Sequence, residues 1–350
     1  MKAQSQSISI ARFTNLKEDD DLQLFVIKYI LNIQNISMGC GAEISFWTIF
    51  TVLVMLIILV AVVFIVIDYI KKKLVNSAQI NYEDYCNTLP PTVYQNAVYI
   101  PASEGIYEQK LSLALLEISY AVATTNCTQV STLPLPPGFT ESLEFSTVVN
   151  GTKNVVGWVI WDSPTKKCCF AFSGSITPQQ FNEDAQFRQV PPTGLNGYVE
   201  GQNMLVHYGF YTTYMSVRDQ IWSWCNSHSD MTHCFSTGHS LGSSLSQLFS
   251  YDVAGFFPNL ISYNYAGPKI SNPQFMSSFA TRVPQNIAVV NLSDLIPNLP
   301  PVVIEGWIYE NAPQTVNFTA SLPSIKETHV NSYSLYMPVC SQNAPCIEDS

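Results

Sequence analysis

A serine flanked by glycines is the part of the sequence that most directly indicates chemistry. Ser240 is the central residue of Gly238–Gly242, which reads GHSLG and fits the pattern G-x-S-x-G. A serine hydroxyl is a poor nucleophile at neutral pH and needs both a neighbouring base and an exposed position. A sharp turn between a strand and a helix supplies that position, and small residues on both sides let the backbone bend. Because Cys234–Thr237 suits a strand and the sequence from Ser243 to Val253 suits a helix, Ser240 is predicted to be a nucleophile.

A serine on such a turn is followed along the chain first by its acid and then by its histidine. Of the five histidines, only His329 comes after Ser240. His329 is therefore the one candidate for the base, and we expect it in a loop because the preceding stretch, residues 326–328, is polar. The carboxylic acids between the two are Asp252, Asp294, Glu305, Glu310 and Glu327.

Asp294 is the preferred acid. It follows the apolar run Ile287–Leu292, and the carboxyl ends of strands in such a sheet carry the catalytic loops. Asp252 lies on the helix that follows Ser240 and would point away from the site. We expect Asp294 to accept the Nδ1 hydrogen of His329 and hold the ring in the reactive tautomer.

Two donors are needed to stabilise the oxyanion that forms when a serine attacks a carbonyl. The backbone N–H of Leu241, next to the nucleophile, is one candidate. The loop in Phe170–Ser175 is the source of the second, because Gly174 allows a turn and Ser175 offers a backbone and a hydroxyl donor.

The elements around these residues alternate between strand and helix. A turn at residues 162–165 predicts a hairpin between two apolar runs. Strands that alternate with helices predict one α/β domain whose central, mostly parallel sheet is covered on both faces. The predicted helices are Leu111–Val122, Tyr211–Cys225 and Ser243–Val253, and the predicted strands are Val155–Trp161, Lys167–Phe172, His233–Thr237, Ile261–Ala266 and Ile287–Leu292.

Six segments in this order resemble the class 3 lipases, a fungal lipase-like family with the α/β-hydrolase fold. Together they extend over roughly residues 110–340, and six ordered motifs are far more specific than one pentapeptide. The segments are Cys168–Ser175, Val206–Ile221, Thr237–Leu248, Gly267–Phe275, Asp294–Pro300 and His329–Tyr333.

The resemblance implies the same triad, Ser240, Asp294 and His329, and an oxyanion hole made by Ser175 and Leu241. It also implies a lid from Ile176 to about Gln186 over an apolar acyl groove, with Phe181 as its apolar anchor.

The sequence departs from the family pattern at two positions. Ser173 stands where many members have arginine, which affects how the oxyanion loop is supported. Lys269 stands where many members have arginine after Gly-Xaa-Pro. Neither position belongs to the triad.

Residues 46–67 carry no charged side chain and are long enough to cross the roughly 30 Å apolar core of a bilayer as a helix. A buried core helix and a cleaved signal peptide are the alternatives, but a signal peptide's apolar stretch is usually shorter. The expected organisation is a poorly ordered tail at 1–45, a transmembrane helix at 46–67, a linker at 68–80 and the hydrolase domain at 81–350.

Two signals disagree about the side of the membrane on which the domain lies. Residues 71–73 are three lysines directly after the span, which favours a cytoplasmic domain. Of the nine cysteines, all except Cys40 lie after the span, and glycosylation sequons begin at Asn126, Asn150, Asn291 and Asn317. The cysteines favour a disulfide-bonded domain outside the cytoplasm, where such a domain would also be glycosylated, but sequons of this kind often arise by chance and add little. We expect the extracytoplasmic location.

The short spacings suggest disulfides between Cys225 and Cys234 and between Cys340 and Cys346. No pair of histidines and no Cys-x-x-Cys has the spacing of metal ligands, so neither a metal nor another cofactor is expected.

The expected function is hydrolysis of a lipid carboxylic ester, an acylglycerol or a phospholipid, by an enzyme anchored through residues 46–67. An esterase of non-lipid, feruloyl-type esters is one alternative, and a non-catalytic lipid-binding protein of the same fold is another. The net charge of −10 argues against nucleic acid as a partner, since phosphate binding needs a basic face. The sequence leaves the oligomeric state open.

Overall fold

The computed structural model describes residues 51–62, 82–95, 97–98, 107–128, 130–149, 151–174 and 187–338. The chain divides into two compact units, Met1–Lys73 and Leu74–Ser350. In the first unit, residues 51–62 form a helix with apolar, mostly exposed side chains.

The expected membrane-spanning helix is described only in part. Its two ends, residues 46–50 and 63–67, lie outside the described residues, as do the tail and the linker. Within the described ranges, no helix has both the length and the apolar character needed to cross a membrane.

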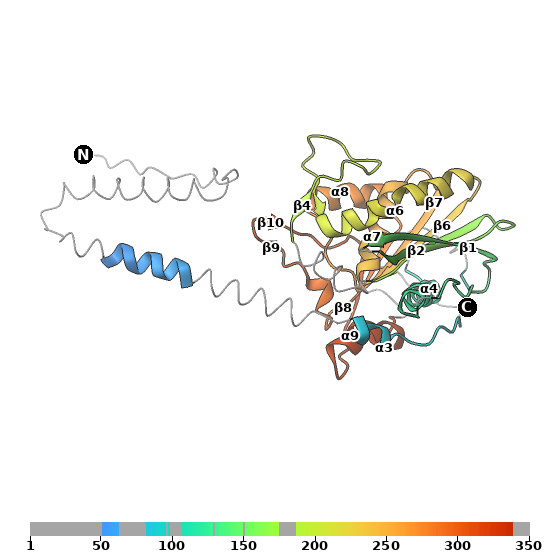
Figure 1. Ribbon diagram of the computed structural model, residues 1–350, viewed down its shortest axis with the longest axis horizontal. Helices are drawn as coiled ribbons and strands as arrows, with labels where there is room; N and C mark the ends of the chain where they lie inside the picture. The colour runs from blue at the N-terminus through green and yellow to red at the C-terminus, as the bar shows by residue number, and fades with distance from the viewer. Residues whose placement is uncertain are drawn as a thin grey trace, which may run out of the picture. The chain divides into compact units, whose positions relative to one another are not determined.

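The second unit is built on a seven-stranded sheet with the order β1-β2-β3-β6-β7-β8-β11 (Figure 1). The first three strands pair antiparallel, and the strands from β3 to β11 pair parallel. This confirms the predicted mostly parallel sheet. The strands are β1 Glu141–Val149, β2 Thr152–Asp162, β3 Lys167–Phe172, β6 His233–His239, β7 Asn259–Tyr265, β8 Asn286–Asn291 and β11 Thr315–Phe318.

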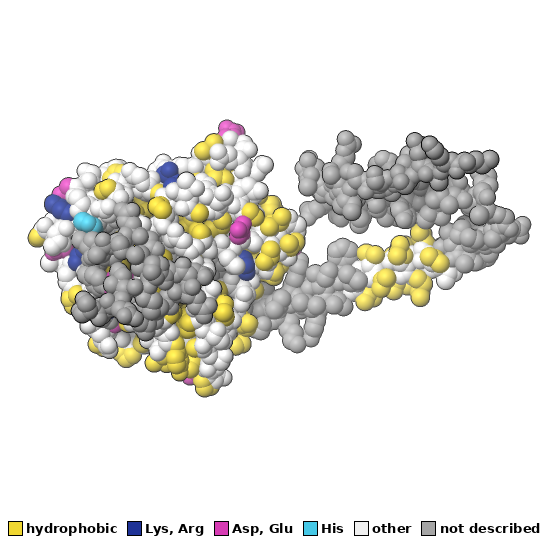
Figure 2. Space-filling view, turned by 180° about the vertical axis from the view of Figure 1, so that it is seen from behind, with side chains coloured by type: hydrophobic (Ala, Val, Ile, Leu, Met, Phe, Trp, Pro, Cys, Tyr) yellow, Lys and Arg dark blue, Asp and Glu magenta, His cyan; other side chains and the backbone are white. Residues whose placement is uncertain are grey.

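Two short antiparallel pairs of strands lie outside the main sheet, β4 (Gln189–Val190) with β5 (Val206–His207) and the hairpin of β9 (Val303–Ile304) and β10 (Trp307–Ile308). In the space-filling view, hydrophobic side chains gather at the edge of the unit where β9 and β10 lie (Figures 1 and 2).

Helices cover both faces of the sheet, as the alternating pattern predicted (Figure 1). Two separate apolar cores result, one on each face. One face carries α3 Tyr82–Thr88, α4 Gln109–Thr128 and α9 Ile325–Leu335, and the other carries α6 Tyr208–Ser227, α7 Leu241–Val253 and α8 Pro273–Arg282.

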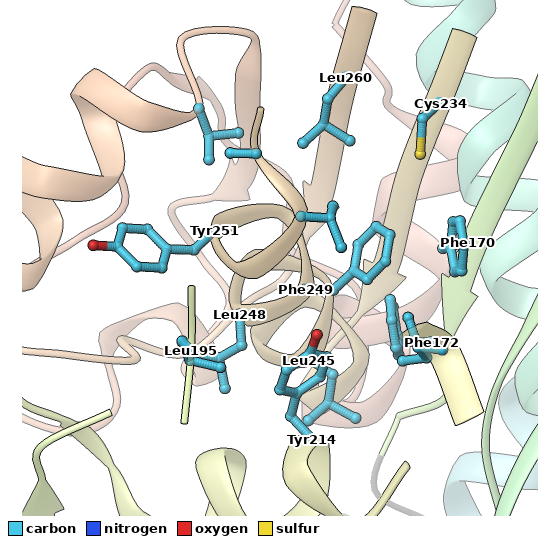
Figure 3. Packing of buried hydrophobic residues seen from close by; sticks show 14 of the residues in the cluster. Phe170, Phe172, Leu195, Tyr214, Cys234, Leu245, Leu248, Phe249, Tyr251 and Leu260 are labelled. Carbon is cyan, nitrogen blue, oxygen red and sulfur yellow. The ribbon is translucent and has the colours of Figure 1, made fainter. Parts of the chain in front are cut away.

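Helix α7 is held by the aromatic side chains of the central strands. Phe249 of α7 packs on Phe170 and Phe172 of β3, with ring centroids 4.3 and 5.5 Å apart (Figure 3). Each of these rings is buried, and burial of such a side chain stabilises the fold by about 1.5–3 kcal/mol. The helix that begins next to Ser240 is therefore rigidly attached to the sheet.

The described cysteines differ from the predicted pairing. Cys225 at the end of α6 and Cys234 on β6 are free and buried, so the predicted disulfide between them is wrong. Each thiol packs into the core from its own element as a small apolar side chain, and burial raises the pKa of both thiols. The second predicted pair, Cys340 and Cys346, lies outside the described residues.

The disulfide that the structure contains joins Cys86 of α3 to Cys127 near the end of α4, 41 residues apart. We predict that replacing both with serine lowers the free energy of unfolding by about 2–4 kcal/mol, because the open chain gains conformational entropy when unfolded. Denaturant titration measures the effect. A reductant should destabilise the native protein to the same extent and leave the double variant unchanged; equal stability of the oxidised native protein and the variant would contradict the prediction.

Two of the four sequons are not available for glycosylation in the folded protein. Asn126 and Asn291 are buried, and their side-chain amides donate hydrogen bonds to Val155 O and Ala320 O. Neither asparagine supports the expected glycosylation, because a glycan would break these bonds and could not fit the buried site. Asn150 lies outside the described residues, and Asn317 is half-buried.

Asp252 connects α7 to α6 as a buried carboxylate. Its two oxygens accept hydrogen bonds from Arg218 at 2.7 and 3.0 Å, Tyr214 at 2.8 Å and Trp222 at 2.8 Å. We predict that Asp252→Ala lowers the free energy of unfolding by about 3–5 kcal/mol, because it leaves the Arg218 guanidinium without its counter-charge.

A matched surface pair provides the control for that variant. Asp230 pairs with Lys166, but both side chains are exposed, so Asp230→Ala should cost no more than about 1 kcal/mol in denaturant titration. Equal effects of the two variants would refute the structural role assigned to Asp252.

Candidate active site

Ser240 lies on a sharp turn between β6 and α7, as predicted. Its backbone has φ 59° and ψ −127°, a strained conformation for a residue other than glycine. The two glycines make the turn possible by close contact. A Cβ atom on Gly238 would lie 2.1 Å from Gly242 O, and one on Gly242 would lie 2.2 Å from Phe172 O. Any larger residue at either position would therefore displace the backbone around Ser240.

Asp294 and His329 are in direct contact. His329 Nδ1 lies 2.8 Å from Asp294 Oδ2, and both side chains are buried. Because an ionised carboxylate only accepts hydrogen bonds, Nδ1 carries the hydrogen and Nε2 of the neutral ring keeps its lone pair. This is the tautomer that can take a proton from a serine hydroxyl. Asp294 is itself fixed by the backbone N–H of Ile296, which donates to Oδ1 at 3.0 Å.

His329 lies in a helix, α9, and the expected loop is wrong. Ser324 and Glu327 form a capping box, in which each side chain accepts a hydrogen bond from the other residue's backbone N–H. This Ser-x-x-Glu spacing is a sequence signal for the start of a helix. The first turns of α9 therefore place His329 on the face that packs towards the sheet, where it is buried.

Tyr333, one turn after His329, ends the last of the six family-like segments and has no role that its sequence motif implies. Its hydroxyl donates to Asp294 Oδ2 at 3.0 Å and accepts from the backbone N–H of Asn291 at 3.1 Å. It therefore ties α9, the acid and the end of β8 together.

We predict that Tyr333→Phe lowers kcat about tenfold with little change in KM, because the acid loses one of its hydrogen bonds. Steady-state kinetics on a soluble ester measures this. Tyr336→Phe is the control, since Tyr336 is 52% exposed, and it should behave as the native protein. Equal kinetics of the two variants would show that the Tyr333 hydroxyl does not position the acid.

His239, the residue before Ser240, connects the turn to the base. Its Nε2 lies 2.8 Å from the carbonyl oxygen of His329, and the two rings have centroids 4.7 Å apart. Burial lowers the pKa of His239 well below its usual range, so the ring is neutral at physiological pH and donates from Nε2. The structure thus brings Asp294 and His329 into contact. Ser240 directly follows His239, whose ring packs on the ring of His329.

The oxyanion hole is described on one side only. Leu241 is the first residue of α7, where backbone N–H groups have no carbonyl partner within the helix. Its N–H is therefore suited to bind a developing oxyanion. Ser175, the predicted second donor, and the predicted lid residues Ile176 and Phe181 lie outside the described residues.

The end of the oxyanion loop is supported by residues that sequence reasoning missed. Ser173 Oγ, where many family members have arginine, accepts a hydrogen bond from Asn126 of α4 at 3.3 Å. Gly174 lies against Tyr85 of α3, since a Cβ on Gly174 would be 2.9 Å from the tyrosine hydroxyl. Both partners come from early segments without a recognisable motif, so only the fold reveals them.

Comparison with known proteins agrees with the motif pattern. The family model described as "Lipase (class 3)" matches residues 169–304. A chloroplastic phospholipase A(1) of Arabidopsis thaliana is 28% identical over 167 residues, which cover 43% of this chain and 37% of that protein. The chain therefore matches little more than a third of the length of this relative.

Solved structures with a similar arrangement include fungal lipases. The triacylglyceride lipase of Rhizomucor miehei is 23% identical with a TM-score of 0.42, covering 52% of this chain and 67% of that chain. A triacylglycerol lipase of Penicillium expansum is 17% identical with a TM-score of 0.44, covering 60% and 81%. Over residues 169–304 the chain is similar to the class 3 lipases, which agrees with the resemblance of its six ordered motifs.

Proposed function

We propose that the protein is a serine hydrolase that cleaves carboxylic esters of lipids, with Ser240 as nucleophile, His329 as base and Asp294 as acid. The hydrogen bond between His329 and Asp294, beside a serine on a strained turn, is the observation that carries the proposal. A buried aspartate that fixes a histidine tautomer is costly to fold and is typical of acyl-transfer sites.

The geometry supports a two-step reaction. His329 Nε2 takes the proton of Ser240 as the hydroxyl oxygen attacks the ester carbonyl, and Asp294 stabilises the imidazolium that results. The N–H of Leu241 donates to the oxyanion, with Ser175 as the second proposed donor. Collapse of the intermediate expels the alcohol, which receives its proton from His329. Water, deprotonated by His329, then attacks the acyl-enzyme and releases the acid and the free Ser240 hydroxyl.

Two features favour a lipid over a soluble ester. The similar Arabidopsis protein is named a phospholipase A(1). In addition, Val302, Val303 and Ile308 of the β9–β10 hairpin region are 58%, 68% and 51% exposed, shortly after the Asp294 loop in the chain. Exposed apolar side chains gathered on one hairpin suit contact with a lipid surface.

Hydrolysis assays on purified full-length protein test the proposal. We expect release of fatty acid from a long-chain diacylglycerol or phosphatidylcholine dispersion, at a higher rate than from a feruloyl ester in solution. Cleavage of the feruloyl ester alone would retain the triad but reject the lipid substrate. Absence of hydrolysis with every ester, from folded protein, would instead support a non-catalytic binding protein.

We further propose that residues 46–67 anchor the protein and that the hydrolase unit lies outside the cytoplasm. The uncharged composition of the segment and the Cys86–Cys127 disulfide support this arrangement. With Asn126 and Asn291 buried, glycosidase treatment would test only the sequons at Asn150 and Asn317. Alkaline carbonate extraction and thiol labelling in intact cells are better: the proposal requires retention in the membrane and an oxidised Cys86–Cys127 pair. Release by carbonate, or a reduced pair, would reject it.

A further inference from the structure

The disulfide between Cys86 and Cys127 joins two residues whose chain neighbours both contact the segment at the end of β3. Tyr85 precedes Cys86 in α3, and Asn126 precedes Cys127 in α4. The side chains of Tyr85 and Asn126 are buried, whereas both cysteines are half-buried. The bond holds the Cα atoms of the cysteines 5.6 Å apart and thereby fixes the backbone next to both buried side chains.

Each of these two side chains supports one residue of the segment that follows β3. Asn126 Nδ2 donates to Ser173 Oγ at 3.3 Å and to Val155 O at 2.9 Å. A Cβ atom on Gly174 would lie 2.9 Å from the hydroxyl oxygen of Tyr85, so the loop approaches the ring as closely as glycine allows. Ser173 therefore rests on α4, and Gly174 rests on α3.

The same segment lies directly against the turn that carries Ser240. A Cβ atom on Gly242 would lie 2.2 Å from Phe172 O, at the end of β3. A Cβ atom on Gly174 would lie 3.3 Å from the carbonyl oxygen of His239. The end of β3 and the nucleophile turn are thus in backbone contact, so a shift of Gly174 displaces the backbone next to the nucleophile.

Tyr85 also contacts the histidine that joins this turn to the base. Its hydroxyl donates to His239 Nδ1 at 3.4 Å, and Nε2 of the same ring donates to His329 O at 2.8 Å. In a neutral imidazole that donates from Nε2, Nδ1 is the acceptor. Helix α3 also packs against α9, which carries His329 (Figure 1). One short helix therefore touches the end of β3, the nucleophile turn and the helix of the base.

Helix α3 depends on contacts with other elements for its position. It has seven residues, well below the roughly 12–15 at which an isolated helix becomes stable in water. Among the side chains described in this helix, only Tyr85 is buried, and only Cys86 is covalently bound to another element. The bond to Cys127 therefore determines where the ring of Tyr85 lies.

From these contacts we infer that the disulfide is a clamp on the active site: it holds Tyr85 and Asn126 against the end of β3 and thereby sets the rate of ester cleavage. The inference rests on the proposed hydrolysis. With the bond intact, Ser173 and Gly174 stay beside the nucleophile turn. With the bond reduced, the substrate still binds but the oxyanion is stabilised less, which lowers kcat and leaves KM unchanged.

The clamp makes full activity depend on the oxidised protein. Disulfides form and persist in oxidising compartments and are reduced in the cytosol. Dithiothreitol opens the bond by thiol–disulfide exchange: its two thiols supply two electrons and two protons, which leaves Cys86 and Cys127 as thiols and the reagent as a cyclic disulfide.

Steady-state kinetics of the purified full-length protein on a soluble chromogenic ester test the clamp. All rates are taken below the unfolding transition of the reduced protein, which circular dichroism locates. We expect dithiothreitol to lower kcat about 10- to 100-fold, the effect of displacing catalytic groups by about 1 Å, and reoxidation to restore it. The Cys86→Ser/Cys127→Ser variant should have the low kcat both with and without the reagent. A folded double variant with kcat within about twofold of the oxidised native protein overturns the inference.

Two further variants separate the clamp from a general loss of stability. Ile221→Ala opens a cavity in the core on the opposite face of the sheet and should keep the native kcat while it is folded. Tyr85→Ala should lower kcat as reduction does, and dithiothreitol should then lower it no further, because the bond acts through this ring. An equal loss of kcat in Ile221→Ala, or full additivity of Tyr85→Ala and reduction, contradicts the clamp.

Hydrogen–deuterium exchange tests the clamp without any substrate. The backbone N–H of Ser173 donates to Val156 O at 2.9 Å, and that of Ser240 donates to Tyr265 O at 3.0 Å. On reduction, we expect peptides that contain these two amides to exchange about fivefold faster, and peptides of α8 to exchange as before. Unchanged exchange in fully reduced protein overturns the clamp. Absence of ester hydrolysis would overturn the proposed function alone, since the exchange rates do not depend on it.

Discussion

Replacing Ser240 with alanine is expected to lower kcat for ester hydrolysis by about 10⁴- to 10⁶-fold, to the level left by binding and oxyanion stabilisation alone. Within the turn Gly238–Gly242, Ser240 carries the only hydroxyl, so no other oxygen on the turn can form the acyl-enzyme. The measurement is the initial rate of hydrolysis of a chromogenic short-chain ester, with burst kinetics to detect the acyl-enzyme.

Ser244→Ala provides the control for this loss. Ser244 lies on the same helix, and its buried hydroxyl has no hydrogen-bond partner. Its removal should leave the rate within about twofold of the native value, since it disturbs no bond. If Ser240→Ala retained a rate within tenfold of the native protein, another residue would be the nucleophile.

The second large effect is expected from Asp294→Asn, with kcat reduced about 10³- to 10⁴-fold and the fold preserved. An asparagine can present an N–H to His329 Nδ1, which stabilises the wrong tautomer and removes the charge that balances the imidazolium. Asparagine has nearly the same shape as aspartate and can keep the 2.8 Å contact with His329, so the loss reports on protonation rather than on packing.

Asp219→Asn makes the same chemical change at an exposed position on α6 and should have native activity. Thermal unfolding of both variants shows whether they are folded. A folded Asp294→Asn protein with activity within a factor of ten of the native enzyme would exclude Asp294 as the acid.

The sequence predicted the site residues where two requirements applied together: the residue type that the chemistry needs and the order of the triad along the chain. The glycines around Ser240 predicted the turn because only glycine fits there: a Cβ atom on either one would lie about 2 Å from a backbone oxygen. The position of Asp294 followed from the apolar strand before it, which is β8. His329 followed from elimination alone, since no other histidine comes after Ser240.

Features that depend on distant segments could not be predicted in this way. The edge strand β1 has no clear apolar pattern, because most of its described side chains are exposed or half-buried and only Phe145 among them is buried. Cys86 and Cys127 pair because α3 lies against α4, whereas chain spacing favoured the wrong pair. The helix around His329, by contrast, is predictable from the Ser324–Glu327 capping signal, although the polar residues 326–328 favoured a loop.

Labelling with a fluorophosphonate probe, followed by peptide mass spectrometry, tests the central claim most directly, because only a serine activated by a neighbouring base reacts quickly. The account predicts one phosphonylated residue, Ser240, with labelling strongly slowed in His329→Ala protein. A folded native protein that is not labelled, or is labelled at another serine, would contradict it.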